Sequence, residues 1–156
     1  MRSILFLFLL CPMLAFGETG HVTIEMKVGC TLSEGNYLNF GYPTVVGAAT
    51  ITITPSGVRS TTGNVVFDNQ VFSTNNYTVN GSPLETYIVT LPSSATLTNG
   101  KTTITVTDFR TSLNSNLGTL DSKGYGTFSV GATMTIPNGT TSGVYNGSYT
   151  ITAQYQ

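Results

Sequence analysis

The chain has 156 residues, of which only 8% are charged, and its 6 basic and 7 acidic residues give a net charge of −1. So even a balance excludes the basic surface that nucleic-acid binding needs and the acidic composition of a disordered tail. Threonine supplies much of the polarity, with 28 residues, and suits the half-solvated face of a strand. With 40% hydrophobic residues the chain can still build a core, a composition typical of a secreted β protein.

The first 17 residues have the pattern of a secretory signal peptide. Arg2 supplies a positive charge, residues 4–10 form an unbroken apolar run, and Ala15 and Gly17 provide a small-x-small cleavage site. The apolar run is too short to span a bilayer, and no other stretch reaches the roughly 18 apolar residues that a spanning helix needs. We therefore expect residues 1–17 to be removed on export and the mature chain to have no transmembrane segment.

Residues 18–29 are predicted to form an N-terminal extension to a single domain of residues 30–156. Within the extension, residues 20–28 alternate between apolar and polar side chains, so they predict a strand with one apolar face. Residues 33–36 break the alternation and are expected to act as a flexible hinge. A terminal strand of this kind can pair with its own sheet or with that of another molecule. Its apolar side chains are Val22, Ile24, Met26 and Val28.

Cleavage of the signal peptide would also remove Cys11, which leaves Cys30 as the lone cysteine of the mature chain. No intramolecular disulfide is then possible. In an oxidising compartment we expect the Cys30 thiol either to be buried and inert or to be available to another chain.

Alternating apolar and polar residues predict a series of short strands through the domain, separated by turn signals. The clearest case is residues 143–156, where the alternation continues to the last residue. An Asn-Gly pair lies inside this strand, so Gly147 is expected to mark a bulge or a close backbone approach. No stretch has the apolar stripe of a helix. The pattern predicts an all-β, immunoglobulin-like Greek-key sandwich. Its other strands are expected at residues 50–54, 77–79, 86–91, 95–98, 102–109 and 127–136, and its turns at 55–57, 80–81, 99–100, 122–124 and 138–139.

Catalytic chemistry has little support in the sequence. The only histidine is His21, on the polar face of the N-terminal strand, and no nucleophile, base and orienting group occur at a recognisable spacing. A secreted hydrolase would need two carboxylates in one cleft, and the acidic residues are scattered at turns and strand ends. No metal-ligand spacing or calcium loop is present. We expect no enzyme activity, no cofactor and no metal ion. The scattered acidic residues are Asp68, Glu85, Asp108 and Asp121, the last of which is expected to form a turn.

Short motifs in the chain resemble two families. Residues 19–32 and the Leu-Asn-Phe-Gly motif at 38–41 resemble the opening of chaperone–usher pilus subunits of the spore coat protein U-like group. The rest of the mature chain is similar to a related family of secreted bacterial domains of unknown function. The second resemblance is carried by residues 38–41, 118–121, 128–132 and 143–151 and by an aromatic residue one position before the end.

The resemblance to pilus subunits implies a mechanism of assembly. Such subunits fold as an immunoglobulin-like sandwich without its seventh strand, which leaves a hydrophobic groove beside the C-terminal strand. A periplasmic chaperone fills the groove first, and the N-terminal extension of the next subunit replaces it as the fibre grows through an outer-membrane usher. Members of the spore coat U-like group commonly pair the cysteine at the Cys30 position with a second one, which this chain lacks. The resemblance makes Val22, Ile24, Met26 and Val28 the donor side chains, and assigns the acceptor groove and chaperone contact to Tyr149, Ile151, Ala153 and Tyr155.

We therefore expect a structural subunit of a pilus on the surface of a Gram-negative bacterium, secreted through the periplasm and contributing to adhesion or biofilm formation. Its partners would be copies of itself or related pilins, the chaperone and the usher. The alternative is a monomeric secreted carbohydrate- or surface-binding sandwich whose loops carry aromatic residues such as Phe72 and Tyr77. The two hypotheses differ in whether residues 22–28 pair with their own sheet.

Overall fold

The computed structural model describes Ile24 and residues 29–156. This part of the chain is an all-β sandwich of antiparallel strands, as the alternation predicts, and its one short 3-10 turn is η1 (Asn114–Asn116). None of the described residues belongs to a helix that is long and apolar enough to cross a membrane. The strands are β1 (Thr31–Asn36), β2 (Pro43–Ile53), β3 (Arg59–Phe67), β4 (Asn75–Asn80), β5 (Thr86–Thr90), β6 (Ser94–Thr98), β7 (Thr103–Thr111), β8 (Leu117–Thr119), β9 (Tyr125–Ile136) and β10 (Thr152–Tyr155).

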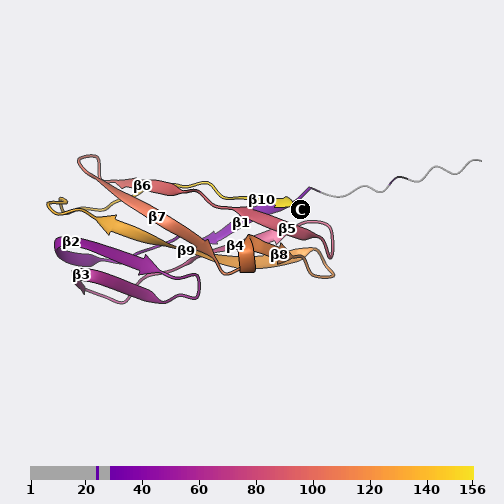
Figure 1. The fold of residues 1–156 in the computed structure, drawn as a ribbon, viewed down its shortest axis with the longest axis horizontal. Coiled ribbons are helices and arrows are strands. Elements are labelled where there is room, and N and C mark those ends of the chain that lie inside the picture. Colours follow the sequence, from indigo (N-terminus) through magenta and orange to yellow (C-terminus); the bar gives the residue numbers. More distant parts are fainter. Residues whose placement is uncertain (1–23, 25–28) are drawn as a thin grey trace, which may run out of the picture.

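The strands form two sheets, and the long strand β9 is the central strand of the larger one (Figure 1). The larger sheet has the order β1-β4-β9-β2-β3, with β7 also paired to β9 and β6 paired to β7, and the smaller sheet has the order β10-β5-β8. β9 pairs with β4 through residues 125–130, with β2 through 132–136 and with β7 through 130–135. β9 therefore connects both ends of the larger sheet.

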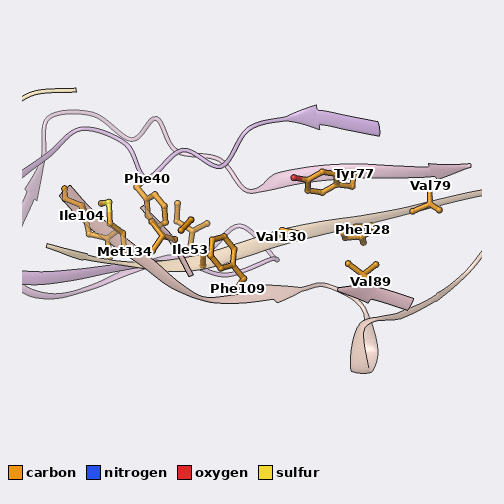
Figure 2. Close-up of a cluster of buried hydrophobic side chains, with 14 of the residues drawn as sticks. Phe40, Ile53, Tyr77, Val79, Val89, Ile104, Phe109, Phe128, Val130 and Met134 are labelled. Carbon is orange, nitrogen blue, oxygen red and sulfur yellow. The ribbon is translucent and has the colours of Figure 1, made fainter. Parts of the chain in front are cut away.

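The predicted inner face of β9 is buried, which confirms the alternation. Phe128 and Val130 are 3% and 0% exposed. Val89 of β5, in the smaller sheet, lies close to Phe128 of β9 (Figure 2). The Tyr77 ring stacks on Phe128 with their centroids 5.3 Å apart. Large apolar side chains from both sheets thus fill the half of the core that the smaller sheet covers.

Several elements differ from the sequence-based prediction. Residues 33–36 belong to β1, because pairing with β4 accommodates their irregular pattern through a shift in register between Glu34 and Asn36. β3 was not predicted, since most of its side chains are exposed and its order comes from pairing with β2. The last strand is shorter than expected: only residues 152–155 form β10, which pairs with β5.

Two local predictions are confirmed. Asp121 forms a turn, since its carboxylate accepts hydrogen bonds from the backbone N–H groups of Tyr125 and Lys123, at 2.9 and 2.8 Å. These N–H groups hold the pKa of Asp121 below its usual range. Gly147 lies where a Cβ atom would collide with the backbone oxygen of Thr96, so the close backbone approach requires glycine.

Candidate functional site

A groove of about 1200 Å³ opens into the half of the core that the smaller sheet does not cover. Protein interiors contain few voids larger than a water molecule, and small-molecule sites measure about 300–1,000 Å³. The volume is therefore large enough to admit a segment of polypeptide. The two walls of the groove are residues 37–47 and 139–149, and apolar residues of β6, β7 and β9 line it, namely Ala95, Leu97, Ile104, Val106, Phe109, Met134 and Ile136.

The wall of residues 139–149 has an almost unpaired backbone. Thr140 donates a backbone hydrogen bond to Pro137 at 3.3 Å, and among residues 142–149 Asn146 alone exchanges backbone hydrogen bonds, accepting one from Thr98 at 2.8 Å and donating one back at 3.0 Å. Backbone N–H and C=O groups are strong hydrogen-bonding groups, and an extended peptide can satisfy them by adding a strand. This wall therefore offers an edge for β-strand addition directly beside the apolar lining of the groove.

The opposite wall is held in place by Arg59. Its guanidinium lies over the ring of Phe67 and the ring of Phe72, 3.4 and 4.3 Å from the two centroids. It donates hydrogen bonds to the backbone oxygen of Phe40, at 3.5 Å, and to Gln70 Oε1, at 3.0 Å. Because Phe40 is buried and lines the groove, this contact attaches the wall to β3.

The rim of the groove is apolar and exposed. Tyr37, Tyr42, Val46 and Val144 line the groove, and each is between 58% and 74% exposed. Contiguous exposed apolar residues on a soluble protein mark interaction sites. The rim and the lining together therefore favour an apolar occupant.

One end of the groove is polar. It is formed by Glu34 of β1, Asn75 and Tyr77 of β4, and Tyr149 of the unpaired wall, which we call the polar end cluster. Asn75 is fully buried, and its Nδ2 lies 2.5 Å from Glu34 Oε1, 2.9 Å from the Tyr77 hydroxyl and 2.8 Å from the Tyr149 hydroxyl. Burial raises the pKa of both Tyr77 and Tyr149. Sequence reasoning missed Glu34 and Asn75; the signal for Asn75 was its alternation with Tyr77 and Val79 on the buried face of β4.

The predicted groove residues occupy two different places. Tyr149 lines the groove. Ile151, Ala153 and Tyr155 pack against the core, but they are not part of the lining. Ala153 and Tyr155 lie in β10, and the Tyr155 hydroxyl accepts a hydrogen bond from the backbone N–H of Ser82 at 2.5 Å. These residues anchor the C-terminus beyond the end of the groove.

The predicted donor strand lies almost wholly outside the described residues. Of its four apolar side chains only Ile24 is described, and it is 81% exposed. Val22, Met26 and Val28, like His21, are outside the described part of the chain. Cys30 is a free, half-buried thiol whose pKa is raised by burial.

Other candidate residues of the sequence are dispersed. Tyr77 is buried and Phe72 lies beneath Arg59, so these two aromatics form no exposed pair. Asp108 forms a surface ion pair with Arg110 at 3.0 Å. Among the described residues, no three His, Cys, Asp or Glu side chains are placed to hold a metal ion.

Comparison with protein families adds one finding. Residues 30–155 match the family described as "Domain of unknown function (DUF4402)". The chain belongs to this family. The DUF4402 match contains both sheets and both walls of the groove, and the N-terminal extension precedes it. Comparison with curated proteins and with solved structures gives no match.

Proposed function

We propose that the protein is a structural subunit of a bacterial surface fibre, in which the N-terminal extension of one copy inserts into the groove of the next. The observation that carries this proposal is the groove itself: core residues of β6, β7 and β9 line it beside a wall whose backbone is almost unpaired. An inserted strand would supply both the missing apolar side chains and the missing hydrogen bonds.

The arrangement of the chain supports a head-to-tail fibre. β1 begins near the C-terminus, whereas the turn that follows β9 lies at the other end of the long axis (Figure 1). The groove extends from the polar end cluster toward that turn, since Pro137 and Gly139 line it. The extension of one copy therefore emerges far from the open end of its own groove and close to that of a neighbour placed in line.

The expected energetics are consistent with insertion. Burying Val22, Ile24, Met26 and Val28 at about 1.5–3 kcal/mol each contributes about 6–12 kcal/mol. Each new backbone hydrogen bond adds about 0.5–1.5 kcal/mol. Ordering the strand costs about 1–2 kcal/mol per residue, so the net gain in free energy from buried apolar area alone is modest. Withdrawal would expose the interior of the acceptor to water, which makes the joint long-lived.

The biological setting follows the same proposal. A periplasmic chaperone would cover the groove before assembly, an outer-membrane usher would export the fibre, and the fibre would contribute to adhesion or biofilm formation by a Gram-negative bacterium. The sequence-based prediction of a signal peptide at residues 1–17 supports export.

The test is electron microscopy of the secreted protein, with and without residues 18–28. We expect fibres from the intact chain and none after the deletion. Ile24→Asp and Met26→Asp should each block assembly, because a carboxylate would enter an apolar groove. Thr23→Asp is the matched control, since Thr23 lies on the polar face of the predicted strand, and it should assemble. A stable monomeric intact chain, or unchanged folding and assembly after deletion of residues 20–28, would refute the proposal.

A second candidate is a monomeric carbohydrate-binding sandwich. The exposed rings of Tyr37 and Tyr42 at the rim favour it, because sugar rings stack on aromatic faces. It predicts that Tyr37→Ala and Tyr42→Ala abolish binding to polysaccharide while the protein remains a monomer.

A further inference from the structure

The polar end cluster leaves one buried hydrogen-bond acceptor without a donor. Asn75 Nδ2 carries two protons but faces three oxygens, those of Glu34, Tyr77 and Tyr149. The other side-chain atom of Asn75, Oδ1, is buried and has no hydrogen-bond partner among the described residues. A buried acceptor without a donor is destabilising, and native proteins rarely leave one unsatisfied. The cluster therefore lacks an N–H group, which an occupant of the groove can bring.

The charge of the cluster indicates which kind of donor fits. Glu34 brings a carboxylate to the end of the groove, and its Oε1 lies against Asn75 Nδ2. Figure 2 shows the hydroxyl oxygen of Tyr77 directed toward the half of the core that contains Phe40 and Phe109. A cationic group with several N–H donors complements a carboxylate and an unpartnered carbonyl oxygen.

The groove is closed at this cluster. Tyr149 reaches from the unpaired wall to Asn75 on β4, and its ring lies 4.9 Å, centroid to centroid, from the ring of Phe109. A chain that passed through would have to displace these contacts. An occupant that ends here keeps them, so a chain terminus fits this position better than the middle of a strand.

We propose that the polar end cluster binds the free amino group of the inserted extension, with Glu34 and Asn75 Oδ1 as acceptors. The inference rests on the proposed function, in which the occupant is the N-terminal segment of a second copy. Capture of an N-terminal amine is a known mode of peptide recognition. It fixes the direction of the inserted strand, which then runs antiparallel to residues 139–149.

The lengths of the two segments are compatible with this direction. Residues 18–28 of the extension are eleven residues, which span about 36 Å when extended. The wall of residues 139–149 contains the same number of positions. With the amine at the polar end cluster, the alternating apolar side chains of the extension face the apolar lining and Val28 lies nearest to the open end.

The experiment uses a synthetic peptide of residues 18–28 with a free or an acetylated amino terminus. The mature chain carrying Ile24→Asp, which is expected not to insert its own extension, is refolded with excess peptide so that the groove is filled as the protein folds. Exchange of a fluorescently labelled peptide then gives the dissociation rate by anisotropy. The same measurement is made with Glu34→Gln added. Asp68→Asn serves as the matched control, because Asp68 lines the groove but is not part of the cluster.

We expect the free-amine peptide to dissociate about tenfold more slowly than the acetylated peptide, the effect of one charge-assisted hydrogen-bonding site. Glu34→Gln should remove most of this difference and Asp68→Asn should preserve it. Equal dissociation rates of the two peptides from the unaltered groove would overturn the amine site while leaving strand insertion intact. If neither peptide forms a complex, the proposed function itself fails. As a second measurement, fibres of the Glu34→Gln chain should dissociate at a lower denaturant concentration than fibres of the Asp68→Asn chain.

Discussion

The amide nitrogen of Asn75 donates a hydrogen bond to the hydroxyl of Tyr149 over 2.8 Å, and this contact joins β4 to the wall that follows β9. The two residues are 74 positions apart in the chain. Their contact closes one end of the groove and places a buried amide, two phenols and a carboxylate in one cluster. Folding and strand capture therefore share the same side chains.

Asn75 Nδ2 contacts three oxygens, and the Tyr149 hydroxyl is only one of them, so substitutions of the two residues should differ in their cost to stability. Tyr149→Phe removes one of three acceptors around Asn75 Nδ2, and two remain, so the free energy of unfolding should fall by about 1 kcal/mol or less. Asn75→Ala removes the buried donor from all three oxygens and should cost about 2–3 kcal/mol. Denaturant unfolding of the mature protein checks both values. The control is Tyr125→Phe, because Tyr125 is 54% exposed. An equal loss in the Tyr149 and Asn75 variants would contradict the assignment of Asn75 as the central donor.

The sequence predicts the parts of the fold that depend on local alternation. The buried face of β9 is an example, because Phe128, Val130 and Met134 follow a period of two and every one of them is buried. The placement of Tyr149 in the groove came instead from the resemblance to pilus subunits. β3 escaped prediction because its residues are mostly exposed, and its pairing with β2 is a tertiary contact.

The polar end cluster could not be predicted from local patterns. Glu34 reaches Asn75 only through the register of β1 on β4, where Glu34 lies opposite Tyr77. The sequence instead suggested that residues 33–36 act as a hinge. Residues 143–151 show the opposite case: their alternation is strong, but most of them form no strand because only Asn146 finds a backbone partner within residues 142–149. A period-two pattern without a partner strand is consistent with an edge that another chain completes.

Arg59 offers a test of how the other wall is held. Arg59→Lys keeps the charge but loses the planar group that lies over Phe67 and Phe72. We expect a loss of about 1–2 kcal/mol in the free energy of unfolding. Arg110→Lys is the matched control, since Arg110 makes a surface ion pair with Asp108 and the change should cost less than about 0.5 kcal/mol. Denaturant unfolding compares the two variants. A loss of unfolding free energy no larger for Arg59→Lys than for Arg110→Lys would contradict the role of Arg59 in holding the wall of residues 37–47.

The buried phenols predict an alkaline limit to stability. Burial raises the pKa of Tyr77, Tyr87 and Tyr149. The unfolded chain releases these protons near the ordinary phenol pKa of about 10, whereas the folded protein retains them. Their contribution is therefore complete below about pH 10 and is lost as the pH rises toward the folded pKa values.

The melting temperature should consequently fall between about pH 9 and pH 11, and the fall should be smaller in Tyr77→Phe. Thermal unfolding followed at a series of pH values measures both slopes. Tyr125→Phe, which alters an exposed ring, should keep the slope of the unaltered protein. If Tyr77→Phe also keeps that slope, the burial of Tyr77 does not govern the alkaline transition.

Gly147 allows the unpaired wall to approach β6, and this approach can be tested. A Cβ atom at position 147 would collide with the backbone oxygen of Thr96 and crowd the side chain of Leu97. Gly147→Ala must therefore push the wall away from β6 and weaken the neighbouring backbone hydrogen bonds between Asn146 and Thr98, which measure 2.8 and 3.0 Å. We expect a loss of about 1–3 kcal/mol, the range seen when a side chain is forced into a packed site.

Gly29→Ala is the matched control for Gly147, because a Cβ atom at position 29 meets nothing within 4 Å. It should leave the free energy of unfolding within about 0.5 kcal/mol of the original value. Hydrogen exchange at the Asn146 and Thr98 amides locates the effect: both should exchange faster in Gly147→Ala, since their bonds lie beside the displaced backbone. Faster exchange confined to β10 would instead show that the substitution acts on the C-terminal strand. Slowed peptide insertion in the same variant would show that the position of the wall against β6 controls access to the groove.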